Sequence, residues 1–300
     1  MTGTVYQTVQ VRGDIGDFFA LLKPRVMTLV VFTGFAGLAI APGQIHPLLA
    51  SVGIFCIALA SGAAGAINMW YDRDIDAVME RTRDRPIPKG RVEPAEALTF
   101  GVILSVFAVM MMFLATNAVA AGLLGTAVLF YVFVYTVWLK RRTSQNIVIG
   151  GAAGAFPPTI GWAAVTGDVG VEAAILFALI FFWTPPHFWA LALYRSQDYS
   201  AAGVPMLPVV RGAQATKWYI LGYTVILMPL ALMPCIFGLT SWVFYGAIAG
   251  ILSGIFIFSA LSVLKDETDR SAKRMFRFSI FYLFALFALL VADDALAIAA

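Results

Sequence analysis

Long, uninterrupted apolar runs are the feature that most restricts the fold of this chain. Nine of them are each long enough to cross a bilayer, which takes roughly 20 apolar residues in a helix. The runs are continuous rather than alternating, and they are far longer than the ~10-residue strand of a membrane barrel. The sequence therefore predicts an all-α membrane protein of about nine transmembrane helices, near residues 19–42, 47–69, 95–116, 119–138, 147–166, 171–193, 216–238, 242–263 and 277–298.

Composition supports the same class of protein. Of the 300 residues, 61% are hydrophobic and only 12% are charged, so the chain is more apolar than a soluble domain of this length. We expect a cytoplasmic tail over residues 1–18 and a single transmembrane domain over 19–300. The tail lacks an apolar core, which argues against a cleavable signal peptide. Cys56 and Cys235 lie singly inside apolar runs, which favours packing over a disulfide or a zinc site.

The basic residues predict the orientation of the chain. All twenty Lys and Arg residues fall in the tail, in gaps between spans or at span ends that nine spans would place on one side of the membrane. By the positive-inside rule, the N-terminus and these loops are cytoplasmic and the C-terminus lies outside. The net charge of +3 is consistent with contact with anionic lipid and an anionic substrate, and not with nucleic acid.

Three oxygen-bearing side chains stand where the second run ends. Asn68, Asp72 and Asp76 are spaced by four residues, so they share one face of a helix. Oxygen ligands of this kind suit Mg²⁺, which typically binds one or two carboxylates plus substrate phosphates. Bases follow from Arg81 to Arg91. The order of charges predicts a magnesium-diphosphate site at the membrane surface; the alternative is a solvated loop with a charged face.

A second elaborate loop, from Tyr194 to Gly212, follows four expected helices later. Each of the two loops opens with polar residues four apart and continues into a proline-containing stretch. A faint duplication of a four-helix unit would place both loops across one central cavity that opens to the cytoplasmic side. Proline pairs at 157–158 and 185–186 are expected to break or kink two spans, where protein or cavity water must satisfy the freed backbone groups.

A metal-diphosphate site at the mouth of an apolar bundle points to prenyl transfer. Metal and bases would neutralise the pyrophosphate of an allylic diphosphate, so that it ionises to a carbocation and alkylates an electron-rich acceptor. The apolar pocket would hold the isoprenoid tail and exclude water that quenches the cation.

Four motifs carry a resemblance to a known family, over about residues 20–292. The first, Asn68-x-x-x-Asp72-Arg-x-x-Asp76-x-x-x-x-Arg81-Thr-x-x-Arg85-Pro, resembles the first aspartate motif of the UbiA-type intramembrane prenyltransferases. Three more are similar to the branch of that family that prenylates haem: Tyr135-Thr-Val-Trp-Leu-Lys140-Arg141-Arg-Thr-Ser-Gln-Asn146, Trp183-Thr-Pro-Pro-His187-Phe-Trp and Asp198-Tyr-x-x-Ala-Gly203-Val-Pro-Met-Leu-Pro.

The resemblance implies farnesyl diphosphate and haem B (protohaem IX) as substrates, Mg²⁺ as the metal and haem O as the product. A porphyrin vinyl group would receive the farnesyl group, and a water would supply the resulting hydroxyl. Asn68, Asp72 and Asp76 would hold Mg²⁺. Tyr194 stands where the wider family has the first acid of a second pair, which leaves Asp198 alone for a second metal. Six bases would bind the phosphate oxygens: Arg73, Arg81, Arg85, Lys89, Lys140 and Arg141.

The haem site implied by the motifs centres on His187, one of only two histidines. A neutral imidazole could ligate haem iron or orient the porphyrin, and a hydrogen-bonded core histidine is an equal alternative. Trp183 and Tyr194 would complete the haem site, although aromatic residues in membrane helices more often serve in packing. His46, in a short outer loop, is expected to be exposed.

Other functions share some of these features. A relative that prenylates an aromatic quinone precursor would carry the same aspartate motif. A transporter would place acids near the bilayer midplane, whereas the acids here lie in loops or near helix ends. A structural assembly protein would not need the Asn/Asp/Asp face. For the enzyme, the expected partners include membrane lipid and, downstream, a haem A synthase or oxidase assembly factors, in a bacterial inner membrane.

Overall fold

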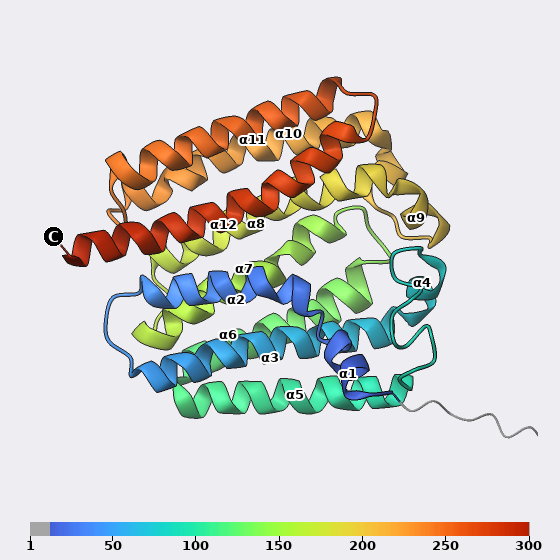
Figure 1. Cartoon of the computed structure of the whole chain (residues 1–300), viewed down its shortest axis with the longest axis horizontal. Coiled ribbons are helices and arrows are strands. Elements are labelled where there is room, and N and C mark those ends of the chain that lie inside the picture. The colour runs from blue at the N-terminus through green and yellow to red at the C-terminus, as the bar shows by residue number, and fades with distance from the viewer. Residues whose placement is uncertain (1–12, 300) are drawn as a thin grey trace, which may run out of the picture.

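A computed structural model describes residues 13–299 as a bundle of long helices, with no strand among those residues (Figure 1). Eight helices are long and apolar enough to cross a membrane, and the first two helices, bent by 53°, make a ninth span if they are counted as one. The predicted all-α membrane class is confirmed. The predicted N-terminal tail falls mostly on residues 1–12, which lie outside the described part of the chain.

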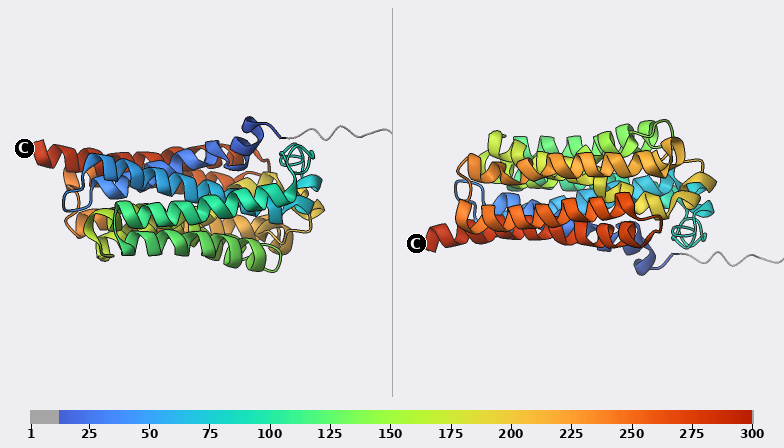
Figure 2. Two further views of the ribbon diagram at one scale, coloured as in Figure 1. Left: turned by 90° about the horizontal axis from the view of Figure 1, so that it is seen from below. Right: turned by 90° about the horizontal axis from the view of Figure 1, so that it is seen from above.

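The helices run alternately up and down the bundle, so that their loops gather at two ends. One end carries the short helices α4 and α9, and the C-terminus lies at the other (Figures 1 and 2). In order, the elements are α1 (Ile15–Leu21), α2 (Pro24–Ala39), α3 (Pro47–Tyr71), α4 (Arg73–Val78), α5 (Pro94–Ala115), α6 (Ala118–Leu129), η1 (Phe130–Leu139), α7 (Asn146–Thr166), α8 (Val171–Tyr194), α9 (Ser196–Ala201), α10 (Leu207–Ile236), η2 (Trp242–Gly246), α11 (Ala247–Lys265) and α12 (Arg270–Ala299).

Local sequence signals explain where several of these helices begin. Proline occupies the first turn of α2, α3 and α5, where its missing N–H costs no hydrogen bond. Glu93 and Glu96 form a capping box at the start of α5, and the Asn117 side chain accepts a hydrogen bond from Ala120 at the start of α6. Each cap satisfies backbone donors that the first turn of a helix leaves free.

Three details of the spans differ from the sequence expectation. Both proline pairs lie inside helices that continue past them, α7 and α8, so neither span is broken there, and the expected kinks stay a prediction. A further helical segment precedes the expected span 216–238 within α10, and Gly212, with a non-helical φ of 80° and ψ of 166°, forms the kink between the two segments. The last part of the fourth expected span winds as the π-helix η1, a form that is frequent at functional sites.

Two hydrophobic clusters divide the core of the bundle. One is formed mainly by α8, α10, α11 and α12, and the other by α3, α5, α6, η1 and α7. Helix α2 packs against α7 at glycines: a Cβ placed on Gly161 would lie 2.0 Å from the carbonyl oxygen of Gly34, and one on Gly37 would lie 2.1 Å from that of Pro158. The two backbones are therefore in direct contact, as small residues allow in membranes.

This contact makes Gly161 the most sensitive position of the fold. We expect Gly161→Ala to force α2 away from α7 and to cost about 3 kcal/mol, the upper part of the usual range for overpacking, because the obstructing atoms belong to the backbone. The matched control is Gly154→Ala in the same helix, where a Cβ meets no atom within 4 Å. Thermal unfolding in detergent should show a lower Tm for Gly161→Ala alone; equal Tm values would contradict the close contact.

Candidate active site

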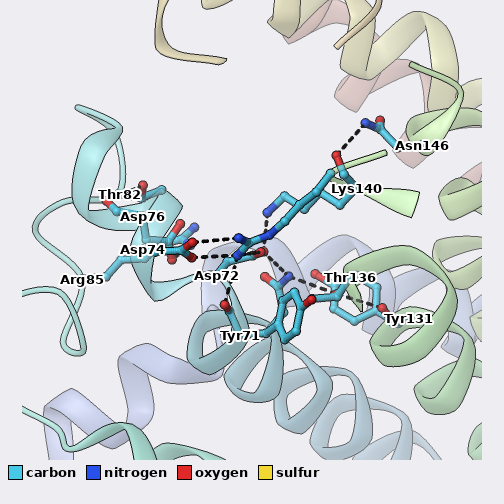
Figure 3. Close-up of polar contacts among 12 residues, drawn as sticks. Tyr71, Asp72, Asp74, Asp76, Thr82, Arg85, Tyr131, Thr136, Lys140 and Asn146 are labelled. Carbon is cyan, nitrogen blue, oxygen red and sulfur yellow. Dashed lines mark hydrogen bonds and ion pairs between the residues drawn. The ribbon is translucent and has the colours of Figure 1, made fainter. Parts of the chain in front are cut away.

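The three oxygen-bearing residues of the first motif lie where α3 gives way to α4, and Figure 3 shows Asp72 and Asp76 there. Asp72 is the last cap residue of α3 and also begins α4, and Asp76 follows one turn later. Asn68, Asp72 and Asp76 are only 4%, 0% and 2% exposed. Buried carboxylates are rare unless they are paired. The solvated-loop alternative therefore does not describe this segment.

Asn68 is the centre of a hydrogen-bond network that joins α3 to η1. Its side-chain nitrogen donates to Asp72 Oδ2 at 2.7 Å and to Thr136 Oγ1 at 3.1 Å. The Thr136 hydroxyl in turn donates to the Tyr131 carbonyl at 2.9 Å. Because the amide nitrogen is fully used in these bonds, the Asn68 Oδ1 atom is held facing the opposite way. That oxygen accepts a hydrogen bond from Lys23 Nζ at 2.8 Å.

Each of the three residues thus presents an oxygen to a basic side chain. Lys140, at the end of η1, pairs with Asp72 Oδ2. Arg85 lies 2.6 Å from Asp76 Oδ2, and Lys23 takes the oxygen of Asn68. In this buried arrangement the carboxylate and amide oxygens can bind an added cation, and the three basic side chains can bind an anion that accompanies it.

Arg141 is held beside this site by a different acid. Its guanidinium makes two contacts of 2.7 Å with Asp74 and one of 3.4 Å with Asp72, and it lies over the Tyr71 ring at 5.0 Å. The hydrogen bonds from Arg141 lower the pKa of Asp74 to about 2, so the pair stays ionised at neutral pH. Arg141 can therefore approach a bound anion while remaining anchored.

Not every predicted residue joins the site. Lys89 pairs with Asp84 at 2.9 Å, and both side chains are largely exposed; Arg73 turns back to the Trp70 carbonyl at 2.8 Å. No contact among the described residues links Arg81 or Asp198 to Asn68, Asp72 or Asp76. We therefore leave Lys89 and Arg73 out of the site proposed below.

Lys23 is a site residue that the motifs did not reveal. It sits at the break between α1 and α2 in a left-handed conformation, with φ 53°, which is unusual for a residue other than glycine. Strained backbone of this kind clusters at functional sites. In the sequence, Lys23 counted only as a basic residue at the edge of an apolar run. Its pairing with Asn68 depends on how α2 packs, which no local pattern records.

The donor set fits Mg²⁺ bound together with phosphate, and not a closed metal site. Among residues 13–299, no group of three or more His, Cys, Asp or Glu side chains is arranged to hold a metal. The site instead offers two carboxylates and one amide, all hard oxygen ligands. Mg²⁺ commonly binds one or two carboxylates and takes its remaining ligands from water and substrate phosphates.

The two elaborate loops pack against each other over this end of the bundle. Ile75 and Met79 from the first loop meet Tyr199, Val204 and Met206 from the second in one buried cluster. Arg195 bridges the loops, with its NH1 atom 3.5 Å from both Glu80 and Asp198. A pocket of about 310 Å³ opens at their junction, lined by Asp74, Ile75, Val78, Arg141, Ala201, Ala202 and Gly203.

A second cluster of predicted residues lies where α8 meets α12. The His187 ring is stacked between Trp183 and Phe276, with ring centroids 4.3 and 4.6 Å away. Its Nδ1 atom lies 2.6 Å from the Ser279 hydroxyl, which itself donates to the Phe276 carbonyl at 2.7 Å. That hydroxyl proton is therefore used, so Nδ1–H is the donor to Ser279. With the proton on Nδ1, a neutral imidazole has its lone pair on Nε2.

Trp183 has a different position from the one expected for a porphyrin contact. Its ring covers one face of His187, and its Nε1 atom donates to the Ser279 carbonyl at 2.8 Å. It therefore fixes the orientation of the imidazole. Tyr194, the last residue of α8, packs edge-on against Phe276, with the two ring centroids 6.2 Å apart. The three residues predicted for haem binding thus belong to one neighbourhood, although their predicted role stays a prediction.

Fold and site together define a multi-pass helical membrane protein with a cation-paired carboxylate site at one end of its bundle. The model of the UbiA prenyltransferase family matches residues 30–286. Similar proteins include a protoheme IX farnesyltransferase from Acidiphilium cryptum, 59% identical over 93% of this chain and 90% of the relative, and one from Gluconacetobacter diazotrophicus, 56% identical over 97% and 95%.

Solved structures of low sequence identity share the fold. A digeranylgeranylglyceryl phosphate synthase superposes with a TM-score of 0.77 at 18% identity, covering 93% of this chain and 98% of the other. A UbiA homolog from Archaeoglobus fulgidus bound to GPP and Mg²⁺ gives a TM-score of 0.64 at 16% identity, over 91% and 99%. The chain belongs to the UbiA prenyltransferase family, as its aspartate motif predicted.

Proposed function

We propose that this protein transfers the farnesyl group of farnesyl diphosphate to a vinyl group of haem B, giving haem O and diphosphate. The observation that carries the proposal is the buried Asn68–Asp72–Asp76 face, each residue of which presents an oxygen to a lysine or arginine. Relatives 55–59% identical over more than nine-tenths of the chain bear the name protoheme IX farnesyltransferase, which favours haem as the acceptor over a quinone precursor.

The chain's own residues would divide the first half of the reaction between them. Asn68, Asp72 and Asp76 would hold Mg²⁺, which supplies Lewis-acid stabilisation of the diphosphate leaving group. Lys23, Lys140 and Arg85 would then turn from these oxygens to the phosphate oxygens. Charge-assisted contacts of this kind favour the negative charge that builds up on diphosphate as its bond to the farnesyl carbon breaks.

The second half of the reaction needs an acceptor held close to the farnesyl carbon. The vinyl group supplies the electron pair for the new carbon–carbon bond, which leaves a cation on the porphyrin side of that bond. Water adds to this cation and loses one proton, so that farnesyl diphosphate, haem B and water become haem O and diphosphate. The apolar spans would shield the farnesyl cation from premature attack by water.

His187 is the residue best placed to hold the acceptor. Trp183 and Phe276 cover both faces of its ring, and Nδ1 is bonded to Ser279. Nε2 is then the one atom of the ring with a lone pair to offer, and a histidine that donates its other N–H is the usual arrangement in a metal ligand. We propose that Nε2 binds the haem iron.

Replacing His187 tests this assignment. His187→Ala is expected to shift the absorption spectrum of bound haem and to lower haem affinity about tenfold or more, the range reported for disturbing metal-binding histidines, with farnesyl diphosphate binding retained. His46→Ala is the control, because His46 is exposed at the far end of the bundle and only caps α3. An unshifted spectrum with unchanged haem affinity would remove the iron-ligand role.

The activity itself is tested with purified protein, haem B, farnesyl diphosphate and Mg²⁺, followed by mass analysis of the porphyrin. The expected product is heavier than haem B by one farnesyl group and one hydroxyl group. A parallel reaction with 4-hydroxybenzoate in place of haem B examines the aromatic-acceptor alternative. Prenylated benzoate together with unchanged haem would overturn the haem assignment and leave the family assignment intact.

We propose a bacterial inner-membrane location with the α4 and α9 end in the cytoplasm. The helix directions support this orientation, since the described Lys and Arg residues lie at or near that end of the bundle. A product that stays in the membrane would be passed to an enzyme or assembly factor of the terminal oxidases, such as a haem A synthase.

A further inference from the structure

The first two turns of α12 carry an unusual concentration of positive charge. Arg270, Lys273, Arg274 and Arg277 lie within eight residues, and no acid occupies the first turn. Cations are unfavourable at the start of a helix, because the helix dipole is already positive there. The preceding loop carries three acids, Asp266, Glu267 and Asp269, and Asp266 directs its oxygens to the backbone of Thr268 and Ser271. Among the described residues, none of the four cations forms an ion pair.

One of these cations, Lys273, lies over an aromatic ring beside the His187 cluster. Its ammonium sits over the Tyr194 ring at 5.5 Å, and Arg277, four residues later, is its neighbour on the helix surface. Between them in the sequence is Phe276, which stacks on His187. With 3.6 residues per turn, Arg274 points about 160° away from Phe276. On the same count Lys273 lies about 60° and Arg277 about 100° from Phe276, so this pair lies nearer to the Phe276 side of the helix than Arg274 does.

From this arrangement we infer that Lys273 and Arg277 bind the two propionate groups of the porphyrin acceptor. The inference rests on the proposed function, and it identifies the carboxylate end of the acceptor site. Lys273 lies one helical turn, about 5 Å, from the level of Phe276 and His187, in the direction of the loop end. A metalloporphyrin with its iron at Nε2 would place acidic groups toward water, where long basic side chains can meet them.

Binding of the propionates at α12 would also orient the vinyl-bearing edge of the porphyrin. Propionates leave a protoporphyrin from one edge, and its vinyl groups lie on the remaining perimeter. With the propionates held at α12, the porphyrin would extend across the bundle toward α3 and η1, which carry Asp72 and Lys140. The farnesyl carbon next to the diphosphate and a vinyl group would then approach one another between these helices.

The test compares haem B with its dimethyl ester, which lacks both negative charges. Full-length protein in nanodiscs of phosphatidylcholine is titrated with each porphyrin, and the absorption change gives the affinities. Wild type should bind haem B about tenfold or more tightly than the diester, as expected for charge-assisted contacts. In Lys273→Gln/Arg277→Gln this difference should disappear, with farnesyl diphosphate affinity retained. Arg270→Gln/Arg274→Gln, which removes the same charge from the same helix, should keep it.

A double variant that still prefers haem B over the diester as strongly as wild type would overturn the inference. Anionic lipid is the other partner these cations could serve. Repeating the titrations in nanodiscs with phosphatidylglycerol addresses it: loss of the preference only in those discs would also overturn the inference. If wild type farnesylates haem B and either result is found, the propionate site alone fails. If wild type neither binds nor farnesylates haem B, the proposed function fails with it.

Discussion

Asp76→Asn is expected to reduce farnesyl transfer by at least about a hundredfold while the protein stays folded. Even partners that only orient a metal ligand cost 10–100-fold when removed, and Asp76 is proposed to bind the metal directly. Its partner Arg85 is 21% exposed, so that cation can reach water once the carboxylate charge is gone. Asp72→Asn should be equally inactive but less stable, because Asp72 is fully buried against Lys140 and breaking such a pair is costly.

The measurement is the initial rate over a range of Mg²⁺ concentrations, with Tm recorded for each variant. Asp84→Asn provides the matched control: it makes the same chemical change in the same loop, at a carboxylate that is 70% exposed and pairs with Lys89. That variant should keep its rate. Wild-type turnover by Asp76→Asn at limiting Mg²⁺ would remove the metal assignment.

Lys140→Ala should weaken farnesyl diphosphate binding by about tenfold or more and leave haem binding nearly unchanged. A charge-assisted hydrogen bond contributes roughly 1.5–3 kcal/mol, and each 1.4 kcal/mol is about a factor of ten in affinity. Removing Lys140 also leaves the buried Asp72 with only Asn68 and a distant Arg141 as partners, so some loss of Tm is expected as well.

The comparison variant is Lys89→Ala, which removes the same side chain from an exposed pair with Asp84. We expect normal affinity for both substrates in that variant. If Lys140→Ala lowered affinity for haem and for farnesyl diphosphate to the same extent, the loss would reflect general disruption of the fold and not a lost phosphate contact.

The fold was predictable because its strongest determinants are local. Apolar length predicts each span directly, and the distribution of lysine and arginine checks their number. What the sequence could not predict depends on packing between distant segments. The prolines at 157–158 and 185–186 are accommodated within continuous helices, and Gly161 matters because Gly34 lies directly opposite, far away in the sequence.

The site was predictable to the same extent. The four-residue spacing of Asn68, Asp72 and Asp76 predicted one helix face; the structure divides it between α3 and α4 at Asp72 and buries all three residues. Bases are harder to place because long side chains reach in several directions: Lys89 and Lys140 look alike in sequence, yet one pairs with an exposed acid and the other with a buried one. Assigning Lys23 to the site depends on the contact between α2 and α3, and no motif in a single sequence encodes that contact.

The cations that already occupy the ligand oxygens make the site selective for a complex over its components. Two carboxylates, Asp72 and Asp76, face three basic side chains, Lys23, Lys140 and Arg85. Burial lowers the pKa of Lys23 to about 7, so Lys140 and Arg85 already balance the two carboxylates without it. A divalent ion arriving alone would add uncompensated positive charge, and a diphosphate arriving alone would be repelled by the carboxylates. When the divalent ion and the diphosphate bind together, each carboxylate exchanges a basic side chain for the metal ion, and each basic side chain exchanges a carboxylate for a phosphate oxygen. Each therefore raises the affinity for the other, a reciprocal linkage that disfavours loading with free Mg²⁺ alone.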